Sequence, residues 1–107
     1  MEFSGKKVTV VGTGISGIGA VGLLNAVGAE VVLYDGNEKL KIEDIEKKLG
    51  TYKAEIVLGE LTKELTDSSD LLVISPGVPI DSPVVKAFEA AGVPIWGEVE
   101  LAYAFDK

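Results

Sequence analysis

The sequence predicts an α/β fold: an open, doubly wound, five-stranded parallel sheet with helices on both faces. Two observations predict it. Five short apolar runs lack the alternation of a half-exposed strand, which is typical of strands covered on both faces. Segments with helical spacing lie between these runs, so strand and helix alternate along the chain. The 107 residues, 47% of them hydrophobic, suit one domain that folds over its whole length.

The five predicted strands are runs of aliphatic and aromatic residues, which favour strands. They cover residues 8–11, 31–34, 56–58, 71–74 and 94–96. Because each run is short and continuous, we expect all five to be buried within one sheet.

Start and stop signals bracket the segments between the strands. Residues 16–27 form the first predicted helix, and Gly28 suits the left-handed position that follows a helix. The second predicted helix has three apolar residues on one face and a glycine at its end: Ile42, Ile45 and Leu49, followed by Gly50.

The helix after the fourth strand has the clearest boundaries. Ser82 is a favourable N-cap, Pro83 suits the first helical position, and Gly92 suits the position after the last turn. We expect this helix to bury three residues: Val84, Phe88 and Ala91. Residues 98–105 are predicted to form the last helix.

The segment 59–70 gives an ambiguous pattern. Leu61 and Leu65 have helical spacing, but threonine and serine surround them, so a short helix and a turn-rich crossover both remain open. Lys107 directly follows the last predicted helix, which leads us to expect that the chain ends at a domain boundary.

The charged and reactive residues exclude several functions. The chain has ten lysines, no arginine, 17 acidic residues and a net charge of -7, and it contains neither histidine nor cysteine. Without histidine and cysteine, a serine or cysteine triad and the usual zinc ligand sets cannot form. The sequence therefore excludes these two classes of site.

The charge balance also bears on partners and location. A negative chain with no cluster of basic residues repels nucleic acid and anionic membrane surfaces, so we expect neither as a partner. The chain shows no apolar leader and no apolar run of spanning length, which predicts a cytoplasmic protein.

A glycine-rich loop follows the first predicted strand. Gly12, Gly14 and Gly17 have G-x-G-x-x-G spacing at the point where the strand becomes a helix, as in Rossmann-like folds. Gly12 permits a tight turn, Gly14 lets a phosphate approach the backbone, and Gly17 lets the helix lie close to the sheet. The alternative is that the three glycines serve packing alone.

The start of that helix is a predicted anion site. The first-turn amides of Ile15, Ser16 and Gly17 lack intrahelical acceptors, and the helix dipole adds to their positive potential. Ser16 is placed to cap the helix and to donate its hydroxyl to a phosphate oxygen. Because the chain has no arginine to clamp a diphosphate, backbone amides must bind it.

Asp35 ends the second predicted strand, 18 residues after Gly17. This position is typical of the acid that accepts a hydrogen bond from a ribose hydroxyl or a base N–H, and it disfavours a 2'-phosphate. Alternatively, Asp35 only starts a turn with Gly36 and Asn37. Ile18 follows Gly17 where a Walker A motif has lysine, so the usual triphosphate cradle is absent.

A second loop follows the fourth predicted strand, with the sequence Ser75, Pro76, Gly77. In a doubly wound sheet this loop neighbours the glycine-rich loop across the switch point of strand order, where ligands bind. Gly77 would expose its backbone amide to a ligand there. The alternative is a proline-stiffened turn that leads into the next helix.

Two further pairs of residues allow two interpretations each. Glu98 and Glu100 follow the fifth strand, where they serve either as ligand-binding or catalytic carboxylates or as favourable charges at a helix start. Tyr34 and Trp96 either pack in the core, which we prefer, or stack on a base.

Four sequence features together resemble the N-terminal domain of the Mur ligases. They are GTGISG at 12–17, Asp35, SPG at 75–77 and GEVEL at 97–101. Within that family the chain is most similar to the branch that adds D-glutamate to UDP-N-acetylmuramoyl-L-alanine in peptidoglycan synthesis. The resemblance extends over essentially the whole chain.

The resemblance implies a role for each site residue. The diphosphate of the UDP portion would be held by Gly14, Ile15, Ser16, Gly17 and Gly77. The uracil and ribose would be held by Asp35, Gly36 and Asn37. The loops would be shaped by Gly12, Ser75 and Pro76. The family pattern has a hydroxyl residue and an arginine after the aspartate, and Gly36 and Asn37 supply neither.

The resemblance also implies a larger parent enzyme. Residues 1–107 would form its single UDP-substrate-binding domain, the first of three, with the central and C-terminal domains as partners. ATP and Mg²⁺ would act in those domains, so the chain alone is expected to need no cofactor and to have no ligase activity. The competing interpretations are the NAD-binding half of a dehydrogenase and an NAD-sensing regulatory module, which explain the same glycines and Asp35.

Overall fold

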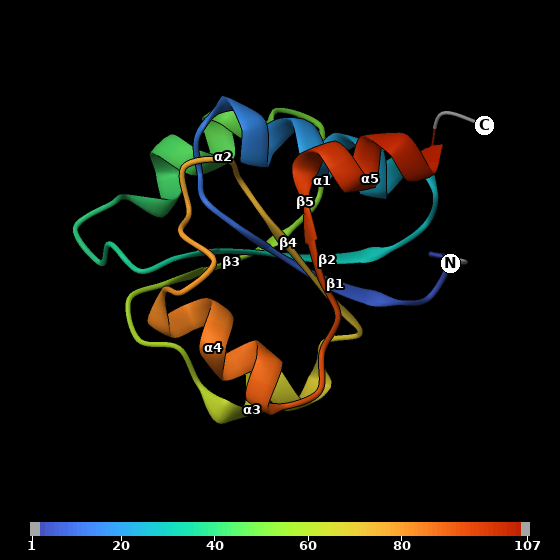
Figure 1. The fold of residues 1–107 in the computed structure, drawn as a ribbon. Helices are drawn as coiled ribbons and strands as arrows, with labels where there is room; N and C mark the ends of the chain where they lie inside the picture. The colour runs from blue at the N-terminus through green and yellow to red at the C-terminus, as the bar shows by residue number, and fades with distance from the viewer. Residues whose placement is uncertain (1–2, 106–107) are drawn as a thin grey trace.

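The computed structural model describes residues 3–105, which form a sheet with helices on its two faces (Figure 1). The strands are β1 (Lys7–Val11), β2 (Glu30–Asp35), β3 (Glu55–Leu58), β4 (Leu71–Ile74) and β5 (Ile95–Gly97). The helices are α1 (Ile15–Ala26), α2 (Ile42–Leu49), α3 (Lys63–Ser68), α4 (Pro83–Ala90) and α5 (Glu98–Phe105). The predicted alternation of strand and helix is therefore confirmed.

The sheet is parallel, with the strand order β3-β2-β1-β4-β5. Val10 of β1 pairs with Leu33 of β2 on one side and with Val73 of β4 on the other. Strand order reverses direction between β1 and β4, which makes this the switch point of the sheet. The chain thus has the predicted doubly wound, Rossmann-like architecture.

Two apolar cores lie on opposite faces of the sheet. Figure 1 shows α1, α2 and α5 on one face and α3 and α4 on the other. Leu24, Ile45 and Leu101 belong to the first core, whereas Leu65 and Phe88 belong to the second. Because both faces are covered, the central strands β1, β2 and β4 are largely buried and read as continuous apolar runs. The expectation that all five strands are buried is wrong for β3 and β5, which lie at the edges of the sheet and are only partly buried. Within the described residues, no helix is both long and apolar enough to span a membrane.

The predicted boundaries of the elements agree with the structure to within one residue where the pattern was clear. The segment 59–70 resolves into the short helix α3, which begins after Thr62. The Thr62 hydroxyl accepts a hydrogen bond from the Leu65 amide at 3.3 Å and so caps this helix. Gly28, Gly50 and Gly92, which follow three of the helices, all have positive φ, as expected for their positions.

The predicted buried faces of two helices need correction. Ile42 is 48% exposed, because it is the first residue of α2 and only the next turns reach the sheet. Ala91 is exposed, because it is the C-cap that ends α4, and Val85 is buried instead. Val84 packs at the edge of the second core. Ser82 is the N-cap residue, but its side chain makes no capping bond within the described residues.

Tyr34 lies in the second core rather than at a ligand surface, which confirms the packing interpretation. Its ring is 5% exposed, and its hydroxyl donates to the Gly59 carbonyl oxygen. Burial raises the pKa of the Tyr34 hydroxyl above its usual value, and the charges of Asp35 and Glu60 raise it further. The neutral phenol is therefore the form that the folded chain stabilises.

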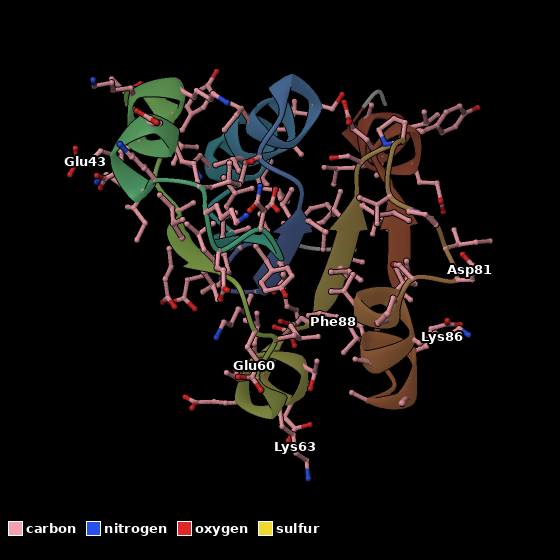
Figure 2. All side chains as sticks on the ribbon, turned by 90° about the vertical axis from the view of Figure 1, so that its left-hand side faces the viewer. Glu43, Glu60, Lys63, Asp81, Lys86 and Phe88 are labelled. Atoms are coloured by element: carbon pink, nitrogen blue, oxygen red, sulfur yellow. The ribbon has the colours of Figure 1, made fainter. Side chains whose placement is uncertain are left out.

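We expect Phe88→Ala to lower the free energy of unfolding by about 3–5 kcal/mol, because it leaves a cavity in the second core. The Phe88 side chain is fully buried and points from α4 toward the sheet, whereas Lys86 points away (Figure 2). Urea unfolding measures the change, and Lys86→Ala is the matched control, with an expected change within about 0.5 kcal/mol. Equal effects of the two substitutions would contradict this description of the core.

We expect Tyr34→Phe to destabilise the fold by about 1 kcal/mol at neutral pH, because one hydrogen bond is lost. The stabilisation from the neutral phenol is present below the unfolded-state pKa of about 10 and is lost as pH rises through the higher folded-state pKa. The variant should therefore lose less stability than the parent sequence on going from about pH 9 to about pH 11. Urea unfolding at several pH values checks this, with the exposed Tyr103→Phe as control.

Candidate functional site

The candidate site lies at the carboxyl ends of β1, β2 and β4. The glycine-rich loop leaves β1, the Asp35 turn leaves β2, and the loop at 75–82 leaves β4. Since these strands are neighbours in the order β2-β1-β4, the three segments meet at one edge of the sheet. This is the edge where doubly wound folds bind ligands.

Two glycines set the shape of the first loop. Gly12 has φ +110°, a conformation that favours glycine, and a Cβ there would lie 2.9 Å from the Ser75 hydroxyl oxygen. A Cβ on Gly17 would lie 2.0 Å from the Gly12 carbonyl oxygen. Helix α1 therefore starts against the turn that ends β1, closer than any side chain permits. A Cβ on Gly14 would meet no atom within 4 Å, which leaves that side of the loop open.

The start of α1 differs from the prediction in one respect. Gly14, with extended backbone, is the N-cap, and the Ile18 amide donates to the Gly14 carbonyl oxygen at 3.0 Å. Ser16 is thus the second residue of the helix and does not cap it, because the N-cap position belongs to Gly14, two residues earlier. The amides of residues 15–17 precede the first intrahelical donor and are left available to an anion.

Asp35 is held by two hydrogen bonds. The Thr13 hydroxyl donates to its Oδ2 at 3.0 Å, and the Asn37 amide donates to its Oδ1 at 3.0 Å. The second bond forms the turn through Gly36, which confirms that Asp35 starts a turn with Gly36 and Asn37. The first bond ties the end of β2 to the glycine-rich loop and fixes the carboxylate beside it.

Thr13 was not anticipated as a site residue. It is 7% exposed and lies between Gly12 and Gly14 in the glycine-rich loop. A hydroxyl residue within the motif, combined with an acid at the end of the next strand, was the signal that could have identified it.

The second loop contacts the first directly. The Ser75 hydroxyl donates to the Val11 carbonyl oxygen at 3.1 Å, and the Val78 amide donates to the Ser75 carbonyl oxygen at 2.9 Å. The latter bond closes a turn over Pro76 and Gly77, both of which are exposed. The structure thus brings the two loops together at the switch point, with Gly77 facing solvent.

The acids after β5 have different surroundings. Oε1 of Glu100 accepts a hydrogen bond from the Gly97 amide at 2.9 Å, which supports the interpretation as a helix start. Glu98 is half-buried, and its Oε2 is buried with no hydrogen-bond partner in the part of the chain that the structure describes. Trp96 packs edge-on against Phe3 with ring centroids 6.0 Å apart, so it serves packing.

The arrangement offers hydrogen-bond donors for an anion and one oriented acceptor. The donors are the open amides of α1 and the exposed backbone of the 75–77 turn, and the acceptor is Asp35. Among residues 3–105, no group of three or more acidic side chains is placed to hold a metal ion. The chemistry that these residues support is binding of a phosphorylated ligand.

Comparison with solved structures supports the fold. A shikimate dehydrogenase from Aquifex aeolicus matches with a TM-score of 0.65 over 94% of this chain and 45% of that chain, at 17% identity. A chorismate mutase/shikimate 5-dehydrogenase fusion protein from Clostridium acetobutylicum matches with a TM-score of 0.61 at 14% identity, over 94% of this chain and 44% of that chain. At these identities the likeness concerns the Rossmann-like fold alone.

Comparison with known sequences identifies the family. A protein from Lachnospira eligens named UDP-N-acetylmuramoylalanine--D-glutamate ligase is 62% identical over all 107 residues of this chain, which cover 24% of that protein. A protein of the same name from Lachnoclostridium phytofermentans is 54% identical over 100% of this chain and 24% of its own length. The chain spans about a quarter of these relatives. The family model of the Mur ligase MurD-like N-terminal domain matches residues 6–97, and the chain therefore belongs to this family.

Proposed function

We propose that this chain binds the UDP portion of UDP-N-acetylmuramoyl-L-alanine, as the N-terminal domain of an ATP-dependent ligase that adds D-glutamate in peptidoglycan synthesis. One structural observation carries the proposal beyond family membership: the glycine-rich loop and the 75–77 turn adjoin at the switch point, where Ser75 bonds to Val11. Two glycine-containing backbone segments then face one ligand position from adjacent strands.

The diphosphate binds to backbone rather than to side chains in this proposal. The amides of Ile15, Ser16 and Gly17 donate to phosphate oxygens from one side, and the backbone of Gly77 approaches from the other. The α1 dipole adds the equivalent of about half a positive charge at that end. Because no arginine is available, the proposal relies on this helix start for positive potential toward a ligand with two negative charges.

The uridine lies toward β2. Each carboxylate oxygen of Asp35 already accepts one hydrogen bond and retains capacity for a second. A uracil N–H or a ribose hydroxyl would supply that second donor. The Thr13 bond orients the carboxylate before the ligand arrives, and Gly36 and Asn37 contribute backbone contacts in place of the hydroxyl and guanidinium of the family pattern.

The remaining chemistry belongs to the rest of the parent enzyme. There ATP and Mg²⁺ would supply the phosphoryl group that activates the alanine carboxylate for attack by the D-glutamate amine. Among the described residues, none is assigned to that step, and the part played by this chain is to hold and orient the nucleotide end of the substrate.

We expect UDP and UDP-sugars, but not NAD, to raise the melting temperature of the purified chain. A ligand that binds only the folded state stabilises it by about 2.7 kcal/mol at a hundredfold excess over Kd. Thermal shift with the three ligands side by side is the measurement. Stabilisation by NAD without stabilisation by uridine ligands would instead favour the dehydrogenase-type interpretation.

We expect Asp35→Asn to weaken UDP binding by roughly tenfold to a hundredfold, because a hydrogen bond to a charged acceptor contributes about 1.5–3 kcal/mol. Calorimetric titration with UDP measures the loss. Asp67→Asn is the matched control, because Asp67 is exposed on α3, outside the three segments of the candidate site, and its substitution changes the net charge by the same amount. Equal Kd values for the two variants would argue against a role for Asp35.

A further inference from the structure

Helix α1 carries no charge on any side, although part of it faces solvent. Residues 8–29, which include the whole helix, contain no charged residue in a chain that is 25% charged. A surface helix normally presents charged or polar residues to water, whereas a helix that is apolar all round is buried. Helix α2 follows this rule, because Glu43, Glu46 and Lys47 are exposed on it, and Glu43 points outward in Figure 2.

The exposed residues of α1 and its C-cap form one apolar ridge. They recur at spacings of three and four residues, which places them on the same face of the helix. We call this face the α1 ridge, and its members are Gly19, Leu23, Ala26 and Val27. Leu23 is 38% exposed and Val27 is 37% exposed, although both are large apolar residues.

Other segments cover the flanks of α1 and leave the ridge open. The Asn25 side chain donates to the Lys53 carbonyl oxygen at 2.9 Å and accepts from the Lys53 amide at 2.6 Å. Tyr52 lies against Gly22, where a Cβ would meet the tyrosine ring at 2.7 Å. Helix α5 also contacts α1, and Figure 1 shows α1 between α2 and α5. Within residues 3–105, the polar Asn25 side of α1 is therefore covered while its apolar ridge is exposed.

The size of the ridge indicates what kind of partner covers it. A stable interface between two separate proteins buries about 800 Å² on each partner. The ridge offers only two partly exposed aliphatic side chains on a 12-residue helix and its C-cap. A partner joined covalently needs less area, because the connection gives it an effective concentration in the millimolar range. The ridge therefore suits a partner in the same polypeptide better than a second copy.

The relatives of this chain contain such a partner. The matching family model describes an N-terminal domain, and this chain covers 24% of the length of each of the two relatives described above. The larger part of such a protein therefore follows α5, the helix that contacts α1. Tyr103 in α5 is 78% exposed, so this helix also leaves a large side chain uncovered.

We propose that the α1 ridge is a docking surface for the part of the parent protein that follows α5. That part packs an uncharged, apolar surface against Leu23 and Val27, and so removes from water the apolar face that this chain leaves exposed. The contact holds the N-terminal domain in a defined orientation relative to the rest of the protein. It rests on family membership and does not depend on UDP binding.

The test measures how fast a cysteine on the ridge reacts with a maleimide. The chain has no cysteine, so Leu23→Cys and Val27→Cys each introduce a single thiol into it. Each variant is prepared as the 107-residue chain and within the full-length parent protein, and mass spectrometry quantifies labelling of the peptide that carries the new cysteine. Because a buried thiol is inert, we expect labelling to be roughly tenfold slower, or more, in the full-length protein.

Lys86→Cys is the matched control, because Lys86 is exposed on α4, on the opposite face of the sheet. Its labelling rate should agree between the two forms within about twofold. Slower labelling at position 23 or 27 with an unchanged control supports the proposal, and if one ridge variant does not fold, the other decides. Unchanged rates at the ridge, or equal slowing of the control, would overturn it. Slowing in the isolated chain as its concentration rises would assign the ridge to a second copy instead.

Discussion

The site depends on one close approach of backbone to backbone. The start of α1 lies against the turn after β1, where the Cα of Gly17 faces the Gly12 carbonyl oxygen at a distance that leaves no room for a Cβ. This contact aims the open amides of α1 at the edge of the sheet. In a chain with net charge -7 and no arginine, the proposed anion site depends on the direction in which these neutral peptide N–H groups point.

The polar contacts around this turn connect the three strands that carry the site. Thr13 reaches Asp35 at the end of β2, and Ser75 at the end of β4 reaches back to the Val11 carbonyl oxygen. Both bonds join segments that are far apart in sequence but adjacent in strand order. The fold and these bonds therefore point to the same edge of the molecule, and the dehydrogenase neighbours share that fold at 17% and 14% identity.

The sequence predicted the fold well, because strands buried on both faces have no polar alternation to obscure them. It also placed the glycine-rich loop, Asp35 and the 75–77 turn correctly relative to one another, since glycine spacing and strand order are properties of the backbone. It did not predict Gly14 as the N-cap of α1, because capping preferences favoured Ser16 over an extended glycine. Exposure of Ile42 and Ala91 depends on where a helix ends relative to the sheet, and the Thr13 to Asp35 bond depends on tertiary packing.

The position of the site on the central strands has a consequence for molecular motion. The edge strands β3 and β5 have one hydrogen-bonded neighbour each. We therefore expect their backbone hydrogen bonds to open before those of the central strands. The glycine-rich loop and the 75–77 turn follow β1 and β4, which are paired on both sides, so we expect the amide protons of these two strands to exchange last. Under the proposed function, the nucleotide would therefore meet loops that are already ordered, and little conformational entropy would be lost on binding.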